Sequence, residues 1–342
     1  MRPATDRDDD PGAPRVLVMT MDRLGDLVNT TPALRAIRRH HPEAHITVEV
    51  IAGTEALLSG SDDFDRIWTT PRHRGWAGRM RQLRRMRAGR FHTAYLLEEC
   101  NDKVILAWLA GIPCRQGLYR SRFRRLYSNC VAISATCHES LGNLRNLLDA
   151  VGIDTSDWNV HLALSGDVQL EARKALNVAG WDGNTSLVGI NVGASNARRI
   201  WTAEGFAEIA RTVHAMDAIP VLLGTGADKP MVVEIKRQAS TPMLDLVGRT
   251  TVGAMAGIIE LCVALVTGDT GPMHIAAGLG CPVVALYGPS DPAITGPQGD
   301  RHVIVQASNA RYDHDAMQSI PASAIVSALS QMIASSRPST FA

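Results

Sequence analysis

The chain has 342 residues, of which 45% are hydrophobic and 20% charged, and its formal net charge is +1. This composition is typical of a globular protein long enough for two domains, and it excludes a mainly disordered chain or one whose overall charge attracts nucleic acid. No apolar run approaches the roughly 20 residues that span a bilayer, and residues 1–14 lack the apolar core of a signal peptide, so we expect a disordered tail there and a cytoplasmic protein.

Short apolar segments alternate with helical patterns along the chain. In the first half, strands are predicted at residues 15–20, 45–51, 66–68 and 94–97, and helices at 56–58, at 103–110 and from near Asp26 or Pro32. After a polar stretch at 154–165 the alternation starts again, with strands at 186–191, 220–223, 261–266 and 282–287 and helices at 167–179, 205–216, 231–239, 251–261, 273–279 and about 322–333. We therefore predict an α/β fold of two doubly wound, Rossmann-like domains, residues 15–163 and 164–342.

Residues 266–277 (VTGDTGPMHIAA) join a predicted strand to a predicted helix through a tight turn. Pro272 suits the first turn of a helix, where its missing N–H group costs nothing. The N–H groups and the dipole of a helix start attract a diphosphate, and Thr270 and His274 would add a hydroxyl and an imidazole. The alternative is a capped turn that binds no ligand.

Two stretches of the chain resemble the signatures of a known family. Residues 269–277 followed by 282–292, together with residues 22–34 (DRLGDLVNTTPAL), resemble glycosyltransferase family 9, which includes the ADP-heptose:lipopolysaccharide heptosyltransferases. The resemblance implies a GT-B fold whose two domains face each other across a cleft. It also implies that the N-terminal domain binds the acceptor and the C-terminal domain binds the nucleotide sugar. Ligands are expected beyond the carboxyl ends of the strands.

Asp26 follows the first predicted strand, so its carboxylate is expected to face a substrate. Sugar transfer to a hydroxyl needs a base that removes the hydroxyl proton, and the resemblance implies that Asp26 is this base. The alternative is an aspartate that caps the following helix. Arg23, three residues earlier, is a candidate for acceptor binding.

The resemblance also implies contacts to the donor. Ser195 would donate a hydrogen bond to a phosphate oxygen. Arg199 would occupy the position where the family usually carries a lysine, so a planar guanidinium would replace a compact ammonium group. A solvated basic turn is the alternative for Arg199. The remaining donor contacts that the resemblance implies are Asp269, Thr270, Gly271 and His274 for the diphosphate, and Asp228 and Thr250 for the nucleoside.

Arginines are concentrated between residues 72 and 125, in the predicted acceptor domain. A basic lining suits an acidic or phosphorylated saccharide, and Arg120 and Arg122 are the candidates nearest the expected cleft. For the cluster as a whole, solvated helix faces, nucleic acid and a membrane surface are the alternatives.

Asp63 and Asp65 have the spacing of a metal site, but they lie in a predicted connector, so we interpret them as surface charge and expect no metal site. The leading interpretation is an inverting, metal-independent glycosyltransferase without a cofactor. By resemblance it moves a heptose from an ADP-activated donor to a saccharide hydroxyl. From the nearly neutral charge and the lack of a long apolar run, we expect that it binds no nucleic acid and has at most a peripheral contact with a membrane. The same chemistry on a secondary-metabolite acceptor, and a nucleotide-sugar-binding protein without activity, are the alternatives.

Overall fold

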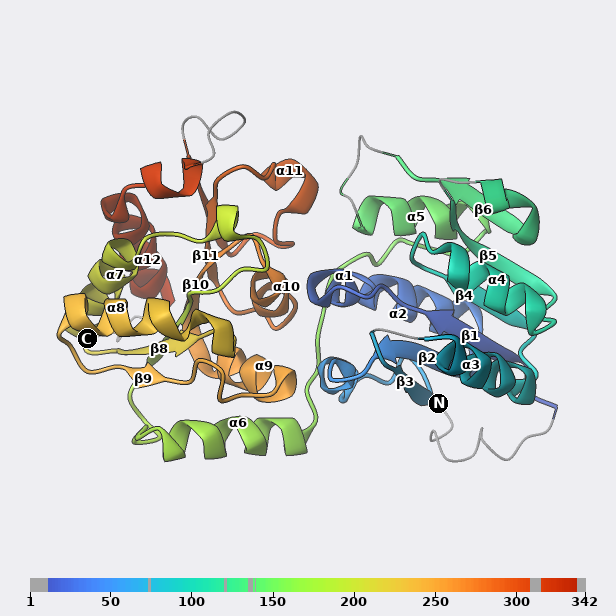
Figure 1. Ribbon diagram of the computed structural model, residues 1–342, viewed down its shortest axis with the longest axis horizontal. Coiled ribbons are helices and arrows are strands. Elements are labelled where there is room, and N and C mark those ends of the chain that lie inside the picture. Colours follow the sequence, from blue (N-terminus) through green and yellow to red (C-terminus); the bar gives the residue numbers. More distant parts are fainter. Residues whose placement is uncertain are drawn as a thin grey trace, which may run out of the picture. The chain divides into compact units, whose positions relative to one another are not determined.

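The structure is a computed structural model that describes residues 12–72, 75–119, 122–134, 138, 140–307 and 315–336. The chain divides into two compact units, Met1–Val160 and His161–Ala342. This division lies close to the boundary expected from the sequence. Each unit contains a sheet of its own with helices around it (Figure 1).

The first unit is built on a parallel sheet with the strand order β3-β2-β1-β4-β5-β6. Its strands are β1 (Arg15–Met19), β2 (His45–Ile51), β3 (Arg66–Thr70), β4 (Thr93–Leu96), β5 (Cys114–Tyr119) and β6 (Asn129–Ala132). Its helices are α1 (Leu24–Asn29), α2 (Thr31–His40), α3 (Trp76–Gly89), α4 (Asn101–Leu109) and α5 (Leu141–Ala150), with 3₁₀ turns η2 (Glu55–Leu58) and η3 (Arg122–Leu126). Helix α2 packs with α5, and α3 packs with α4. Right-handed connections place these two pairs on opposite faces of the sheet.

The second unit is also built on a parallel sheet, with the order β12-β11-β10-β7-β8-β9. Its strands are β7 (Leu187–Asn191), β8 (Ile219–Leu223), β9 (Leu244–Asp245), β10 (Cys262–Gly268), β11 (Val283–Tyr287) and β12 (His302–Gln306). Its helices are α6 (Gly166–Val178), α7 (Ala203–Ala215), α8 (Lys229–Ala239), α9 (Val252–Leu261), α10 (Gly271–Gly278), α11 (Pro292–Thr295) and α12 (Ala322–Ser336), with 3₁₀ turns η4 (Ala197–Arg199), η5 (Gly226–Asp228) and η6 (Ala316–Ser319). Helix α6 packs on α9, and α7 packs on α8 and α12.

Both sheets have the same topology. The first strand of each, β1 or β7, lies in the middle, with the next two strands on one side of it and the last three on the other. The direction of winding therefore reverses between β1 and β4 and again between β7 and β10. Open α/β sheets bind ligands beyond the carboxyl ends of the strands at such switch points, so the loops after these four strands are the places to look for a site.

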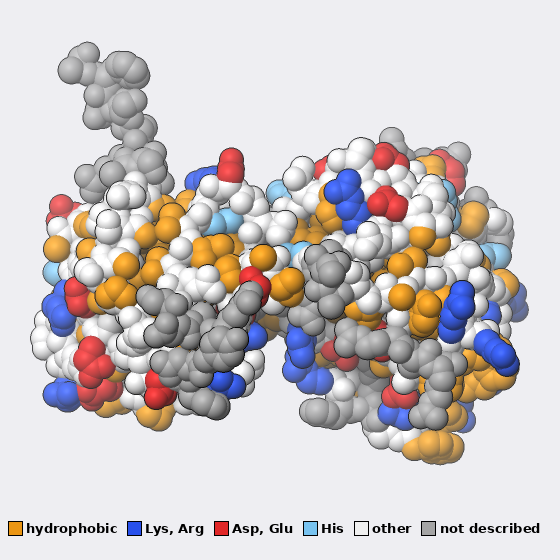
Figure 2. Space-filling model, turned by 90° about the horizontal axis from the view of Figure 1, so that it is seen from above, with side chains coloured by type: hydrophobic (Ala, Val, Ile, Leu, Met, Phe, Trp, Pro, Cys, Tyr) orange, Lys and Arg blue, Asp and Glu red, His pale blue; other side chains and the backbone are white. Residues whose placement is uncertain are grey.

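The structure confirms the predicted α/β fold and the predicted strands and helices, with small differences at their ends. The first predicted helix is two helices, α1 and α2, and the short helix expected at residues 56–58 is a 3₁₀ turn. No helix in the described part of the chain is long and apolar enough to cross a membrane. On the surface shown in Figure 2, basic side chains are separated by hydrophobic, acidic and neutral ones, as expected for a nearly neutral chain.

Candidate functional site

The turn between β10 and α10 has the predicted form. Helix α10 begins at Gly271, with Thr270 at the N-cap and Pro272 in the first turn. The Thr270 side chain does not cap the helix. Its hydroxyl instead lies 3.0 Å from the Thr267 hydroxyl and accepts a hydrogen bond from Nδ2 of Asn191 at 3.2 Å. The Thr270 hydroxyl therefore does not occupy the start of α10. Pro272 has no N–H and the Met273 N–H donates to the Thr270 carbonyl at 3.1 Å, so the Gly271 N–H is the group that an anion at this helix start could meet.

Asn191, at the end of β7, connects the two strands of this switch point. Its Nδ2 also donates to the Gly193 carbonyl at 2.9 Å and to the Thr267 hydroxyl at 3.1 Å. Asn191 is buried, and these bonds fix the turn after β10 against the loop after β7. Sequence reasoning missed this residue, although a polar side chain at the end of an apolar strand is a signal that could have indicated it.

Arg199 and Asp269, two of the predicted donor residues, lie together. Nη1 of Arg199 is 3.2 Å from Oδ2 of Asp269 and donates to the Asp269 carbonyl, also at 3.2 Å. The Thr295 hydroxyl donates to the same carboxylate at 3.3 Å. The Asp269 side chain is 6% exposed and that of Arg199 is 33% exposed. The buried carboxylate therefore orients the guanidinium, whose outer part remains accessible to a ligand.

Asp228 lies against the loop that follows β7. Its Oδ2 accepts hydrogen bonds from the backbone N–H and the hydroxyl of Thr225, at 2.7 and 2.8 Å. A Cβ atom on Gly193 would lie 2.2 Å from this oxygen, so only glycine allows the two loops to approach so closely. Ser195, two residues further along the loop, is exposed.

Thr250 lies in the loop before α9, and its neighbour Thr251 caps that helix by accepting a hydrogen bond from the Ala254 N–H at 3.0 Å. Gly248 has a φ of +68°, and a Cβ atom there would lie 2.8 Å from Cα of Gly226. The loops after β8 and β9 are thus in contact, and the residues predicted to bind the nucleoside lie on adjoining loops.

His274, predicted to lie beside the phosphate, is 8% exposed and belongs to the buried side of α10. Nearby, Tyr287 donates a hydrogen bond from its hydroxyl to the Thr295 carbonyl at 3.0 Å. Burial raises the pKa of Tyr287 above its ordinary value, and the charge of Asp269 adds to this effect. The phenol is therefore neutral and helps to fix the segment that holds Asp269.

In the first unit, Asp26 is half-buried in the first turn of α1. The N-cap of this helix is Arg23, whose exposed side chain makes no capping bond. The alternative that Asp26 caps the helix is therefore wrong. A carboxylate in the first turn interacts favourably with the helix dipole.

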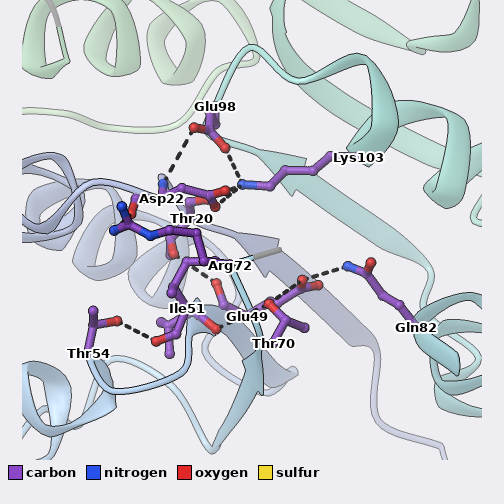
Figure 3. Close-up of polar contacts among 11 residues, drawn as sticks. Thr20, Asp22, Glu49, Ile51, Thr54, Thr70, Arg72, Gln82, Glu98 and Lys103 are labelled. Atoms are coloured by element: carbon purple, nitrogen blue, oxygen red, sulfur yellow. Dashed lines mark hydrogen bonds and ion pairs between the residues drawn. The ribbon is translucent and has the colours of Figure 1, made fainter. Parts of the chain in front are cut away.

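A buried lysine holds the loop that leads from β1 to Asp26 (Figure 3). Nζ of Lys103, on α4, donates to the Thr20 carbonyl at 2.6 Å, to Oδ1 of Asp22 at 3.0 Å and to Oε2 of Glu98. Lys103 is 3% exposed. Burial alone would lower its pKa, but the charges of Glu98 and Asp22 raise it above the ordinary value, so the amine is protonated. Sequence reasoning missed both Lys103 and Glu98.

The same loop has two further attachments. The Thr20 hydroxyl donates to the Glu49 carbonyl on β2 at 2.8 Å, and Arg72, after β3, donates to the Asp22 carbonyl at 3.1 Å. The Glu49 carboxylate accepts hydrogen bonds from Thr70 and Gln82. The loop before Asp26 is therefore held from the ends of β2 and β3 as well as by Lys103.

The structure describes only part of the residues predicted to bind the acceptor. Arg120 and the side chain of Arg122 lie outside the described part of the chain; only the backbone of Arg122, at the start of η3, is described. Arg23 lies on the exposed surface next to the first turn of α1.

The interpretation of Asp65 as surface charge is wrong. Its side chain is 2% exposed, pairs with Arg38, which is 4% exposed, and accepts a hydrogen bond from the Ile46 N–H at 2.7 Å. Asp63 is partly buried, and this burial raises the pKa of its carboxyl group. Among the described residues, no group of three or more histidine, cysteine or acidic side chains is placed to hold a metal ion.

The sequence matches glycosyltransferase family 9 (heptosyltransferase) over residues 79–322. The chain belongs to glycosyltransferase family 9. It is 26% identical to lipopolysaccharide heptosyltransferase 2 of Escherichia coli K12 over 308 residues, which is 85% of this chain and 88% of that protein.

Solved family 9 structures have the same fold. The glycosyltransferase family 9 protein of Veillonella parvula is 24% identical, with a TM-score of 0.88 over 94% of this chain and 98% of that one. The E. coli heptosyltransferase WaaC with ADP is 17% identical, with a TM-score of 0.73 over 93% and 99%. The resemblance found in the sequence and the GT-B type of fold are thus confirmed, and the protein is a glycosyltransferase.

Family 9 membership leaves the roles of individual residues untested. The matched region begins at residue 79 and does not include Asp26. It does include Arg199 and Asp269, whose contact is a feature of this structure. The roles of these side chains are therefore part of the proposal that follows.

Proposed function

We propose that this family 9 enzyme transfers a heptose from ADP-heptose to a hydroxyl group of a lipopolysaccharide core saccharide. The observation that carries the proposal is family membership combined with the helix start of α10 and the Arg199–Asp269 contact at the β7/β10 switch point. The E. coli relative is described as a lipopolysaccharide heptosyltransferase, and the WaaC structure is described as containing ADP. The C-terminal domain would bind the donor and the N-terminal domain the acceptor.

The donor diphosphate would bind at the start of α10. Three groups can stabilise its negative charge: the Gly271 N–H at the positive end of the α10 dipole, the Arg199 guanidinium and the Ser195 hydroxyl. Asp269 would act indirectly, by holding Arg199 in place. Asp228 and Thr250, on the adjoining loops, would contact the nucleoside.

Asp26 would act as the general base. Its carboxylate accepts the proton of the acceptor hydroxyl while the hydroxyl oxygen attacks the anomeric carbon of the heptose. The bond from that carbon to the diphosphate breaks, its electron pair stays on the departing ADP, and the configuration at the anomeric carbon is inverted. The growing charge on ADP is met by Arg199 and the start of α10.

We further propose that the reaction needs neither a metal ion nor a cofactor, because Arg199 and the helix dipole supply positive charge at the leaving group. The acceptor would be acidic or phosphorylated, with Arg23, Arg120 and Arg122 as its contacts.

The test is transfer by the purified enzyme, with ADP-heptose as donor and a lipopolysaccharide core that lacks its heptoses as acceptor. ADP release should depend on the acceptor, mass spectrometry should show an added heptose, and NMR should show an inverted anomeric configuration. ADP release without a saccharide product, or a product that retains its configuration, would contradict the mechanism. Tight ADP binding without transfer to any core acceptor would overturn the proposed acceptor.

A further inference from the structure

We propose that Lys103 is a positioning residue for the transfer reaction: it holds the loop of residues 20–23, and through this loop it sets the position of Asp26. The inference rests on the proposed role of Asp26 as the base. It adds a residue that has no place in the mechanism above, because Lys103 is almost completely buried and its Nζ is bonded to protein groups.

The contacts of Lys103 join three parts of the first unit. Its ammonium group has three donors, and the three acceptors are the Thr20 carbonyl, the Asp22 carboxylate and the Glu98 carboxylate (Figure 3). Thr20 directly follows β1, Glu98 follows β4, and Lys103 itself lies in the first turn of α4. The buried Lys103 side chain therefore links the loops that follow β1 and β4, at the switch point between these two strands.

The charges in this group favour a rigid loop. Asp22 and Glu98 would repel each other without a cation between them, and the ammonium group interacts with both. The backbone N–H of Asp22 also points to Oε1 of Glu98, at 3.5 Å. Removal of Lys103 would leave two carboxylates facing each other and would release the Thr20 carbonyl.

Asp26 lies only three positions after residues 20–23, so the position of this loop determines the position of Asp26. Arg23 is the N-cap of α1, and Asp26 is the third residue of that helix. The Leu27 N–H donates to the Arg23 carbonyl at 2.9 Å, so a shift of residues 20–23 moves the first turn of α1 with it. A displacement of about 1 Å in a reacting group can lower a rate roughly 100-fold.

The first experiment compares Lys103→Met with Lys236→Met. Lys236 lies in the second unit, pairs with Asp245 at 2.7 Å and is 46% exposed, so the control removes the same group from an exposed ion pair. We expect Lys103→Met to lower kcat roughly 10- to 100-fold. ADP affinity should stay within about twofold of the parent, because the donor site lies in the other unit, and Lys236→Met should leave both quantities unchanged. A kcat near that of the parent in folded Lys103→Met would overturn the proposal.

A second variant covers the case in which Lys103→Met does not fold. Asp22→Ala removes one acceptor of Lys103 from a side chain that is 36% exposed, so the folded state should survive. We expect a lower kcat and faster hydrogen exchange of the amides of residues 20–27. When both variants fold, the double variant Asp22→Ala/Lys103→Met should lose much less kcat than the product of the two single losses, because both substitutions disrupt the same interaction. Unchanged kcat or unchanged exchange in Asp22→Ala would overturn the proposal.

The outcomes separate this inference from the proposed function. If the parent enzyme transfers no heptose, the proposed function fails. Hydrogen exchange of residues 20–27 in the parent and in the variants still tests whether Lys103 keeps this loop in place. If the parent transfers heptose and Asp26→Asn is inactive but Lys103→Met is fully active, the function stands and the positioning role is wrong.

Discussion

The contact between Arg199 and Asp269 predicts a specific loss of ADP affinity in Arg199→Ala. The substitution removes a guanidinium from the proposed diphosphate site and leaves a nearly buried carboxylate beside the start of α10, where it would repel the ligand. Truncating one partner of a buried charge pair lowers binding by roughly 2–5 kcal/mol. Because a third of the Arg199 side chain is exposed, we expect about 2–3 kcal/mol, which corresponds to a roughly 30- to 150-fold higher Kd.

Titration calorimetry with ADP measures this effect, and two further variants show its origin. Arg199→Lys keeps a cation beside Asp269 and should recover most of the affinity. Arg199→Ala combined with Asp269→Asn removes the repelling carboxylate and should bind ADP more tightly than Arg199→Ala alone. Arg198→Ala is the control, since Arg198 is the exposed neighbour in η4. An Arg199→Ala enzyme with parental affinity would refute the reasoning, and a larger loss in Arg198→Ala would move the phosphate contact to that residue.

Three other predictions concern the base, the metal and Asp65. Asp26→Asn should keep parental ADP affinity while kcat, measured by steady-state kinetics, falls roughly 10²- to 10⁴-fold. A kcat equal to that of the parent would show that Asp26 is not the general base. Thorough treatment with EDTA should leave most of the transfer rate intact, whereas a loss that magnesium, manganese or ferrous iron restores would show a metal requirement. Asp65→Ala breaks a buried ion pair and should lower the free energy of unfolding by about 3–5 kcal/mol in urea titrations, against about 1 kcal/mol or less for Asp63→Ala; equal losses would contradict this difference.

The sequence predicted the central strands well because their patterns are strong. Strands β2 and β7 are buried along their whole length and carry the β-branched apolar residues that buried parallel strands favour, although β2 also buries His45, Thr47 and Glu49. Strands β5, β6, β9 and β12 were missed. Three of them, β6, β9 and β12, lie at the edges of their sheets, where half-exposed positions accept polar residues, and β5 begins with the half-buried residues Cys114, Arg115 and Gln116. Helices α3 and α5 were missed as elements; in α3, arginines dominate the sequence and only a few side chains are buried.

The candidate site was predictable only where its residues follow one another along the chain. The turn at Thr270 was predicted because strand, turn and helix signals are consecutive there. The contacts of Lys103 and Asp65 were not, because their partners are distant in sequence: Lys103 meets Asp22 across 81 positions, and Asp65 meets Arg38 across 27. Burial of a charged side chain depends on the partner that the fold supplies, and no local pattern encodes that partner.

The central position of β7 also has a consequence for the order in which the second unit assembles during synthesis. Its neighbour β8 follows closely along the chain, but its other neighbour, β10, begins only at Cys262. Until that segment leaves the ribosome, one edge of a fully buried strand has no partner and can pair with other chains. The bonds from Asn191 to Thr267 and from Arg199 to Asp269 close loops of 76 and 70 positions, so they can form only after this later segment has been made. A chain that stopped before residue 262 would be open at its middle strand and would lack the partner that orients Arg199.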